Sequence, residues 1–520
     1  ESELRGMPEP DRSAVMDLVF GDLEPSVVRI KPRPAMEPTN DDADPAVVNA
    51  AGFVRPDDHL WQLDEIFARG GAPRLIAALW TPPAWMKTNG SELRGSLSPG
   101  MESELAEFFS VYVGYLLGAG YTLDGLSIQN EPEAKPPWDS CYYNAAQYTA
   151  TAEAVAQRLA ADARTVPLTS PDNAIASFAP VFLTPLLATP TAGPATTAVA
   201  FHAYQHDYYQ ADEIGDSIAS LAAEVPAGLP LWMTEFSNTT GIGYGSWDEA
   251  MAQAELVHAA FVNGASMYVM WNLYRPGGPG EALVVIPTSP GVAGYTVTPK
   301  YWSFRQYTKW VRPGAVRIGA TSADPEVLTS AYRDTAAGTL TTVLINRRSE
   351  ARWGVMNGTC LGPALHVVRS SETESGVELP PASPERFADR AVLLPPRSVT
   401  KKAPSGRNAS ARSFRAAREA TRQRPCQAAS GRPWSSRTSG MRGLVRRLGS
   451  SKAARASSGI AARNSASATP HAASERGMPT SSSSASILWK KRSRRSASVC
   501  PPSPTTQPSC AYFSGATYAL

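Results

Sequence analysis

Between Pro10 and Asn272, short apolar or β-branched runs alternate with longer segments in which apolar residues recur at helical spacing. This alternation is typical of βα units and predicts an α/β fold built on a parallel sheet. The expected strands are Val27–Ile30, Arg74–Trp80, Gly125–Asn130, Val166–Ser170, Ala198–Tyr204, Pro230–Glu235 and Ser266–Trp271. The expected helices are Asp57–Ala68, Glu102–Leu117, Asn144–Ala161, Phe178–Leu187, Asp212–Ala223 and Trp247–Asn263.

The number of strands favours a barrel over an open sheet. A helix-like segment, Asp11–Phe20, precedes the first expected strand and has no strand of its own. A (β/α)8 TIM barrel that lacks its first strand would give this pattern. The alternative, an open doubly wound sheet, would favour a glycine-rich phosphate loop, and neither GxGxxG nor GxxxxGK[ST] occurs in the sequence. We therefore predict a catalytic barrel over residues 1–300, truncated at its N-terminus.

The pattern changes after the barrel. From about Tyr301 to Thr400 the helical period fades, and EVLTSAYR, LTTVLINRR, ALHVVRS and AVLLPPRS have the character of short strands, which predicts a β-sandwich-like side domain over 301–400. Residues 401–520 hold 22 of the 49 Lys and Arg residues and two of the 47 acidic residues. The net charge is therefore −18 before Lys401 and +20 from Lys401 onward. We expect this low-complexity tail to be disordered.

The basic tail allows more than one interpretation. It could bind a polyanion, it could be a generic disordered segment, or it could be the out-of-frame translation of a GC-rich gene. Few aromatic residues accompany its basic residues, so we expect no specific nucleic-acid partner. Deletion from Lys401 is expected to leave the activity and the folding of the body unchanged or improved. No uninterrupted apolar run reaches the roughly 18 residues of a membrane helix, so no membrane span is expected.

Two apolar strands end in a glutamate. The segment GLSIQNEP brings Glu131 and the segment PLWMTEFS brings Glu235. Catalytic residues of TIM barrels lie at the C-terminal ends of strands, and these two ends are three βα steps apart, so the carboxyls should face each other across the barrel mouth. Opposed carboxyls are what glycoside hydrolysis requires. Taken singly, each glutamate would more simply be a salt-bridged residue at a strand end.

Aromatic residues at or just after the expected strand ends could stack on the apolar faces of sugar rings. They are Trp80, Trp85, Trp138, Tyr142, Tyr143, Tyr204, Trp247 and Trp271. His202 and His206 are four residues apart, but in a strand this spacing separates the rings by roughly 13 Å. One metal ion could not take both, so we expect no metal site.

The motifs LWTPPAWMKTNG, SIQNEPE, FHAYQ, LWMTEFSN and YVMWNLY resemble glycoside hydrolase family 30, the glucosylceramidase-like family of clan A retaining enzymes. The resemblance covers roughly Asp11 to Thr400 and implies a (β/α)8 barrel with a β-sandwich beside it. It implies that Glu131 is the acid/base and that Glu235 is the nucleophile. It further implies that Asn130 binds the sugar 2-hydroxyl and that no cofactor is needed.

The resemblance also gives roles to residues around the two glutamates. Tyr204 is expected to donate a hydrogen bond to Glu235, and His202 to support the site rather than act as a catalyst. Arg29 matches an arginine that points toward the nucleophile, although a plain structural ion pair is nearly as good an interpretation. Glu133 is expected to be a supporting or cation-paired carboxylate.

The resulting functional prediction is a retaining β-glycoside hydrolase. Its carbohydrate substrate would be a β-linked polysaccharide or oligosaccharide of the xylan, β-1,6-glucan or β-1,6-galactan class. The alternatives are an inactive truncated barrel that only binds glycans, or a protein that binds polyanions through its basic tail. We expect a monomer with an extracellular or periplasmic location in a bacterium.

Overall fold

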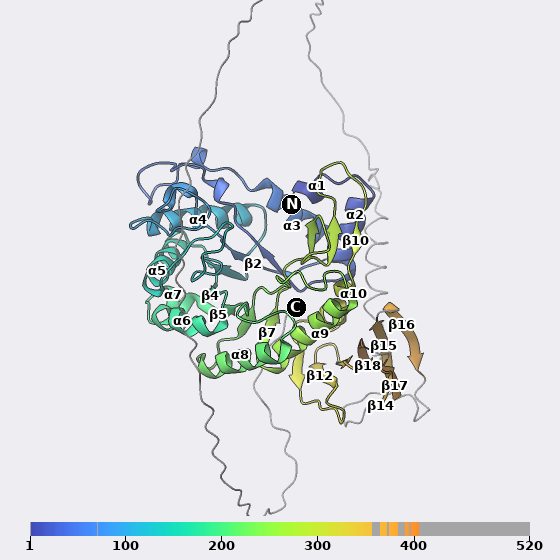
Figure 1. Cartoon of the computed structure of the whole chain (residues 1–520). Helices are drawn as coiled ribbons and strands as arrows, with labels where there is room; N and C mark the ends of the chain where they lie inside the picture. Colours follow the sequence, from blue (N-terminus) through green and yellow to red (C-terminus); the bar gives the residue numbers. More distant parts are fainter. Residues whose placement is uncertain are drawn as a thin grey trace, which may run out of the picture. The chain divides into compact units, whose positions relative to one another are not determined.

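The computed structural model describes residues 2–69, 71–355, 365–371, 374–382, 391–394 and 397–404. Its largest sheet has seven parallel strands that pair in chain order, with β1 and β7 at the two ends (Figure 1). These strands are β1 Val27–Ile30, β2 Arg74–Ala78, β3 Gly125–Ser127, β4 Leu168–Asn173, β5 Thr196–Phe201, β6 Leu231–Met233 and β7 Ala265–Tyr268. All seven expected strands are present, so the predicted α/β fold is confirmed.

The sheet is curled rather than flat. Arg29 in β1 donates a hydrogen bond to Glu235, which follows β6, although four strands separate β1 from β6 in the sheet order. A side chain can bridge strands so far apart only if the sheet bends round on itself. The curling brings the C-terminal ends of the strands around a common centre, as the barrel prediction requires.

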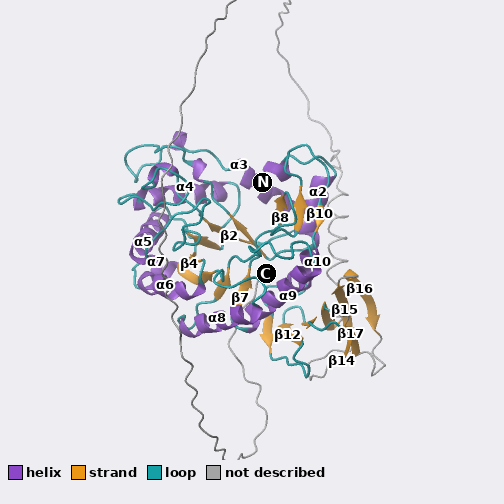
Figure 2. Ribbon diagram, in the orientation of Figure 1, coloured by secondary structure: helices purple, strands orange, loops and turns teal. Residues whose placement is uncertain are grey.

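Helices surround the curled sheet and follow its strands along the chain (Figure 2). The longer ones are α3 Asp57–Ala68, α4 Glu102–Gly118, α5 Ala145–Ala161, α6 Ala179–Leu187, α8 Ala211–Glu224 and α9 Trp247–Val262, and each lies within two residues of its expected bounds. The others are α1 Ser2–Arg5, α2 Asp11–Met16, α7 Ala192–Ala195 and α10 Pro299–Thr308. A π-helical turn, Asp17–Asp22, follows α2 directly.

The helix ends have local causes that the sequence carries. The Asn144 side chain accepts a hydrogen bond from the Gln147 main-chain N–H at 2.9 Å and so caps α5. The Gln147 side chain donates to the Leu97 carbonyl at 2.9 Å. Gly120, just beyond α4, has a φ of 89°, a conformation that glycine adopts without steric cost. The expected start of α5 and stop of α4 are thus both confirmed.

A small sheet after β7 was not expected from the sequence. Its strands are β8 Tyr274–Pro276, β9 Val284–Ile286 and β10 Thr296–Val297, paired in the order β10-β9-β8. They are two or three residues long and lie in a stretch rich in glycine and proline, which hid them from a search for strand-like periods.

Antiparallel sheets follow α10, as predicted for the side domain. Six strands pair in the order β11-β12-β13-β18-β15-β16, and β14 pairs with β17. Their bounds are β11 Val316–Ile318, β12 Val327–Asp334, β13 Thr339–Asn346, β14 Arg352–Val355, β15 Leu365–Ser371, β16 Glu374–Ala382, β17 Ala391–Leu394 and β18 Ser398–Pro404. The four strand-like segments of the sequence correspond to β12, β13, β15 and β17.

The expected boundary at Thr400 falls inside β18. Residues 401–404 continue this strand, and they pair with β13 on one side and with β15 on the other. The deletion from Lys401 considered above would therefore remove part of a central strand. The rest of the expected tail, 405–520, lies outside the described residues.

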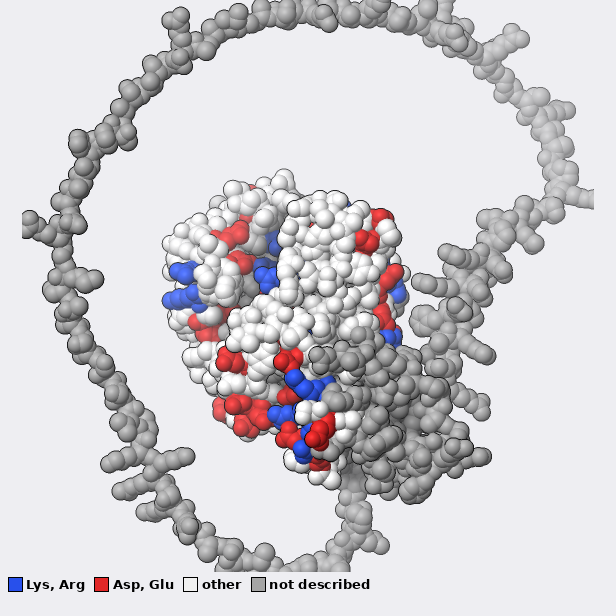
Figure 3. Space-filling model, turned by 45° about the vertical axis from the view of Figure 1, so that its right-hand side comes forward, with Lys and Arg blue, Asp and Glu red and all other residues white. Residues whose placement is uncertain are grey.

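Charged side chains on the described surface are interspersed. On the face drawn in Figure 3, Lys and Arg lie in small groups beside Asp and Glu, with uncharged residues between them. Within the described part of the chain, no helix combines the length and the apolar character that crossing a bilayer requires.

Candidate active site

Five polar side chains meet at the C-terminal ends of the strands. Arg29 lies in β1 and Asp172 in β4. Glu131 lies four residues beyond β3, His202 directly follows β5, and Glu235 lies two residues beyond β6. Each of the five is at least nine-tenths buried as a side chain. The parallel sheet therefore gathers three carboxyls, one guanidinium and one imidazole in one enclosed place.

Backbone strain marks two of these positions. Glu131 has a φ of 52° and Asp172 a φ of 69°, in the left-handed region that residues with a side chain rarely adopt. The Glu131 main-chain N–H donates to the Asp172 carbonyl at 2.9 Å, so the two strained residues hold each other. Such a conformation costs about 1–3 kcal/mol per residue and is found mainly at functional sites.

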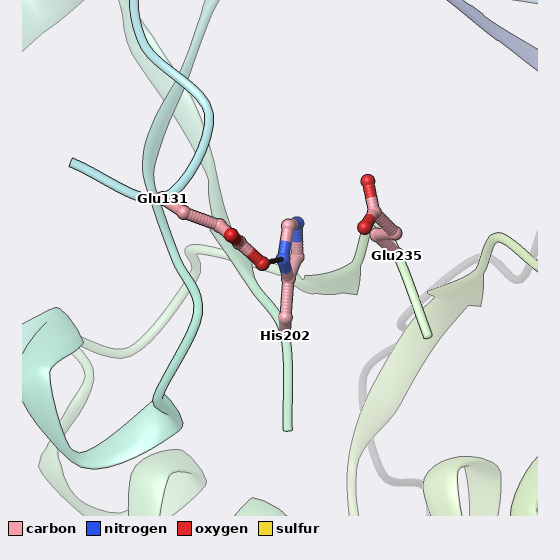
Figure 4. A group of neighbouring side chains, drawn as sticks. All are labelled: Glu131, His202 and Glu235. Carbon is pink, nitrogen blue, oxygen red and sulfur yellow. Dashed lines mark hydrogen bonds and ion pairs between the residues drawn. The ribbon is translucent and has the colours of Figure 1, made fainter. Parts of the chain in front are cut away.

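Glu131 and Glu235 approach closely. A carboxylate oxygen of Glu131, a carboxylate oxygen of Glu235 and a ring nitrogen of His202 all lie within 4.8 Å of one another. The His202 ring lies between the two carboxyls (Figure 4). Retaining glycosidases have carboxyl groups about 5–5.5 Å apart and inverting ones about 6.5–9.5 Å apart. The spacing here agrees with the retaining class.

The two glutamates have different hydrogen-bond partners. Glu235 accepts from Arg29 Nη1 at 2.6 Å and from the Tyr204 hydroxyl at 3.1 Å. Glu131 is 3.1 Å from His202 Nδ1. Two donors on one carboxylate favour its ionised form. The expected contacts of Arg29 and Tyr204 with Glu235 are present, and the Arg29 contact opposes the rise in its pKa that burial causes.

Arg29 is the centre of the network. Its Nη2 donates to Asn130 Oδ1 at 2.7 Å and to Asp172 Oδ2 at 2.8 Å. Burial raises the pKa of Asp172, but the positive charge of Arg29 and a hydrogen bond from His202 outweigh it, and the pKa lies well below its usual value. Asp172 is therefore an anion that holds Arg29 and His202 in place.

Opposing influences act on the pKa of Glu235. Burial raises it, the charges of His202 and Arg29 lower it, and the charge of Glu131 raises it. The net direction is upward. Because Glu131 contributes to that rise, removal of the Glu131 charge would let Glu235 ionise more readily.

His202 is held as a cation by its neighbours. Burial lowers its pKa, but the charge of Glu235, hydrogen bonds to Asp172 and Glu131, and the charge of Asp172 raise it from 6.5 to about 10. The Nε2 atom lies 3.4 Å from Asp172. The imidazolium therefore balances part of the negative charge of Glu235 and Asp172.

This pKa predicts a pH-dependent stability. A group with a raised pKa in the folded state stabilises the fold fully below its unfolded pKa and loses that effect as the pH rises through the folded value. The melting temperature of the wild type should therefore fall between pH 6.5 and 10 by more than that of His202→Gln. Thermal unfolding at several pH values would measure this, and parallel curves for the two proteins would contradict it.

Glu131, His202 and Glu235 lie close enough together to hold a metal ion, but their charges argue against it. A metal ligand must be a neutral imidazole, and the raised pKa of His202 opposes that form. Glu235 is already paired with Arg29. The other histidine of the HAYQH segment, His206, is hydrogen-bonded through Nε2 to the Ser217 hydroxyl at 2.7 Å.

Of the predicted tryptophans, Trp80 and Trp271 lie near Arg29, whereas Trp85 and Trp138 lie in loops. Trp80 lies beside the site. The guanidinium carbon of Arg29 is 4.6 Å from the centroid of the Trp80 ring, and the Trp80 and Trp271 ring centroids are 5.5 Å apart. Trp85 donates from its indole nitrogen to the Glu37 carbonyl at 3.1 Å, and Trp138 is 52% exposed in the loop after β3. These contacts leave the rings of Trp80 and Trp271 as a pair near Arg29.

Trp247 lies apart from the glutamates in its described contacts. It is the first residue of α9, it is buried, and its indole nitrogen donates to the Arg397 carbonyl at 2.6 Å. This contact ties α9 to the segment before β18. The structure thus gives Trp247 a packing role and offers no support for it as a residue that binds substrate.

Glu133 has a structural environment. Its carboxylate accepts from the Asn173 side chain at 2.7 Å and from the Ile175 main-chain N–H at 2.9 Å. It therefore fixes the loop after β4 through amide donors instead of pairing with a cation.

The residue that sequence reasoning missed is Asp172, which lies near the end of β4 in the segment LTSPDN.

Known proteins with similar sequences are named as a glucuronoxylanase, a glucosylceramidase and an endo-1,6-beta-D-glucanase. The chain is 24% identical over 267 residues to glucuronoxylanase XynC of Bacillus subtilis, covering 50% of this chain and 57% of that protein. It is 26% identical over 307 residues to putative glucosylceramidase 4 of Caenorhabditis elegans, covering 54% and 57%. It is 24% identical over 276 residues to endo-1,6-beta-D-glucanase neg1 of Aspergillus fumigatus, covering 48% and 53%. The chain spans little more than half the length of these relatives.

Solved structures share the fold. The glycoside hydrolase family 30 subfamily 8 xylanase Xyn30A from Clostridium acetobutylicum matches with a TM-score of 0.56 and 24% identity, covering 75% of this chain and 92% of that one. The family 30 xylanase C catalytic domain from Talaromyces cellulolyticus matches with a TM-score of 0.62 and 17% identity, covering 78% and 94%. No protein-family profile matches the chain. The curated relatives support the resemblance to glycoside hydrolase family 30, and the solved structures show that the fold is shared.

Proposed function

We propose that this protein hydrolyses β-glycosidic bonds with retention of anomeric configuration. The observation that carries the proposal is the approach of Glu131 and Glu235, with carboxylate oxygens within 4.8 Å of each other. This distance leaves room for a sugar carbon between the two groups and too little for a sugar and a water together. The names of the relatives support the same class of reaction.

In this proposal Glu235 is the nucleophile. Arg29 and Tyr204 hold its two oxygens and stabilise the anion that attacks the anomeric carbon. Glu131 has no such pair of donors and protonates the leaving oxygen in the first step. In the second step it takes a proton from water, which then hydrolyses the glycosyl ester on Glu235.

Asn130 and the tryptophans would hold the sugar. The Asn130 carbonyl oxygen accepts from Arg29, so its NH₂ group remains as the donor for a substrate hydroxyl. A hydrogen bond to the 2-hydroxyl that strengthens in the transition state would accelerate the reaction. Trp80 and Trp271 would pack against the apolar face of a sugar ring.

We propose a β-linked polysaccharide or its oligosaccharides as substrate, of the xylan, β-1,6-glucan or β-1,6-galactan class. A glycan panel with product analysis tests this, and NMR of the first-formed anomer tests retention. Cleavage of one of these polymers to a β-anomer is the expected result. Binding of a glycan without cleavage would instead favour a catalytically idle barrel. The monomeric state and the extracellular or periplasmic location stay predictions.

A further inference from the structure

Four carboxyl side chains gather away from Glu131 and Glu235, between the segment after β1 and helix α4. Glu37 and Asp41 belong to that segment, and Glu104 and Glu107 lie one turn apart on α4. One carboxylate oxygen from each of Asp41, Glu104 and Glu107 lies within 4.8 Å of the other two. Glu37 and Glu107 are each 1% exposed, and Glu104 is 7% exposed. We call these four residues the acidic cluster.

Several oxygens of the acidic cluster are buried without a hydrogen-bond partner among the described residues. They are Oδ1 of Asp41, Oε1 of Glu107 and both carboxylate oxygens of Glu37. The Asp41 main-chain N–H lies near enough to Glu37 to lower its pKa but outside good hydrogen-bond geometry. Asp41 is oriented through its other oxygen, which accepts from the Asn49 main-chain N–H at 2.6 Å. A buried polar atom without a partner costs about 1–3 kcal/mol, and more when it is charged. Four such oxygens in one cluster indicate a ligand that accepts electron pairs.

The protein supplies little positive charge here. Among the described contacts, Arg158 Nη2 lies 3.8 Å from Glu107 Oε1, too far for a hydrogen bond. The same guanidinium pairs with Asp162 at 2.7 Å and donates to the Pro45 carbonyl. Burial and the charge of Asp41 raise the pKa of Glu37 and of Glu107 to about 8 in each case. The carboxylates thus repel one another with one shared cation nearby.

We propose that the acidic cluster binds a divalent cation of the calcium type, which clamps the segment after β1 to helix α4. Carboxylate oxygens are the ligands that hard cations prefer, and Ca²⁺ accepts six to eight oxygens in flexible geometry, with carbonyls and water completing the set. The absence of sulfur or imidazole from this donor set disfavours zinc and copper. This site is independent of the chemistry at Glu131 and Glu235.

The clamp would also act on the mouth of the barrel. The Glu37 carbonyl accepts the indole N–H of Trp85, and the Met36 carbonyl accepts the Val54 main-chain N–H at 2.7 Å. A cation on Asp41, Glu104 and Glu107 would attract the Glu37 carboxylate, whose charge interacts with all three, and would thereby restrain Trp85 in the loop after β2. Binding of the ion would order one wall beside the proposed sugar site.

Calorimetric titration of CaCl₂ into the EDTA-treated full chain, with thermal unfolding in parallel, tests the proposal. We expect saturable binding of one ion and a higher melting temperature with Ca²⁺. Glu104→Gln and Glu107→Gln should weaken binding by about tenfold or more, because affinity follows the number of charged ligands. Glu224→Gln, a matched change at an exposed position on α8, should leave binding unchanged.

Two outcomes would overturn the proposal. The first is no binding heat and no thermal shift in the wild type, together with Glu→Gln variants of equal or greater stability, which would mean that the carboxyls hold protons instead of an ion. The second is binding that persists in Asp41→Asn and Glu107→Gln, which would place the ion elsewhere. Asp41 is partly exposed, so Asp41→Asn is the variant to use if the buried ones fail to fold.

Discussion

Glu235→Ala is expected to reduce kcat/KM on a cleaved β-glycan by at least about a thousandfold, because it removes the group that forms the covalent bond to the sugar. Azide should restore turnover by entering the space of the missing carboxylate, and the product should be an α-glycosyl azide. Glu131→Ala should yield a β-glycosyl azide on a substrate with a good leaving group. Product NMR distinguishes the two anomers, and the opposite pairing would reverse the assigned roles.

Glu133→Gln is the matched control for these variants. Glu133 lies two residues from Glu131 in sequence and is largely buried, but its carboxylate bonds to Asn173 and to Ile175. Its replacement should lower stability without producing any glycosyl azide. Azide-dependent product from this variant would mean that rescue reports on the loss of any nearby carboxylate, and the roles of Glu131 and Glu235 would lose their support.

Lys300→Met is expected to lower the free energy of unfolding by about 3–5 kcal/mol, because it leaves the buried Glu249 carboxylate without its charged partner. The Lys300 ammonium and the Glu249 carboxylate are both fully buried and lie 2.8 Å apart. Glu249 also accepts from the Asn238 side chain and from the Gly245 main-chain N–H. This pair therefore organises the loop that follows Glu235, and denaturant unfolding of the variant measures its contribution.

The double variant Lys300→Met with Glu249→Met separates charge from packing. Replacing both members of a buried pair by apolar residues is commonly close to neutral, so the double variant should recover most of the lost stability. Arg275→Met, which breaks the exposed pair with Glu281, should cost less than about 1 kcal/mol. A Lys300→Met loss no greater than that of Arg275→Met would refute the importance of the buried pair.

The helices and strands could be predicted because, along most of the barrel, the hydrophobic period and the length of each segment indicate the same type of element. The expected bounds of β1 and α3 are those of the structure, and other elements differ only at their ends. The strand expected at Pro230–Glu235 pairs only over Leu231–Met233. Beyond it, the Thr234 main-chain N–H still donates to the Phe201 carbonyl at 3.0 Å, while the Thr234 hydroxyl donates to Asp172 and Glu235 accepts from Arg29.

Asp172 shows why part of the site escaped prediction. Proline and aspartate are both rare in strands, so the segment LTSPDN predicted a strand that stops at Ser170. The structure continues β4 to Asn173 and thereby carries Asp172 to the same edge as the other site residues. This error arose where tertiary contacts, rather than local period, decide the outcome. Trp247 begins α9 as expected, and its role in binding substrate stays a prediction.

The left-handed backbone at Glu131 favours one substitution, to glycine, if selection for activity is lost. Glycine adopts this conformation freely, whereas a residue with a side chain carries a penalty of about 1–2 kcal/mol. A glycine at position 131 would remove the carboxyl and relieve that penalty at the same time. A descendant released from selection for catalysis could thus become more stable through its own inactivation, and a glycine here would identify it as a pseudoenzyme.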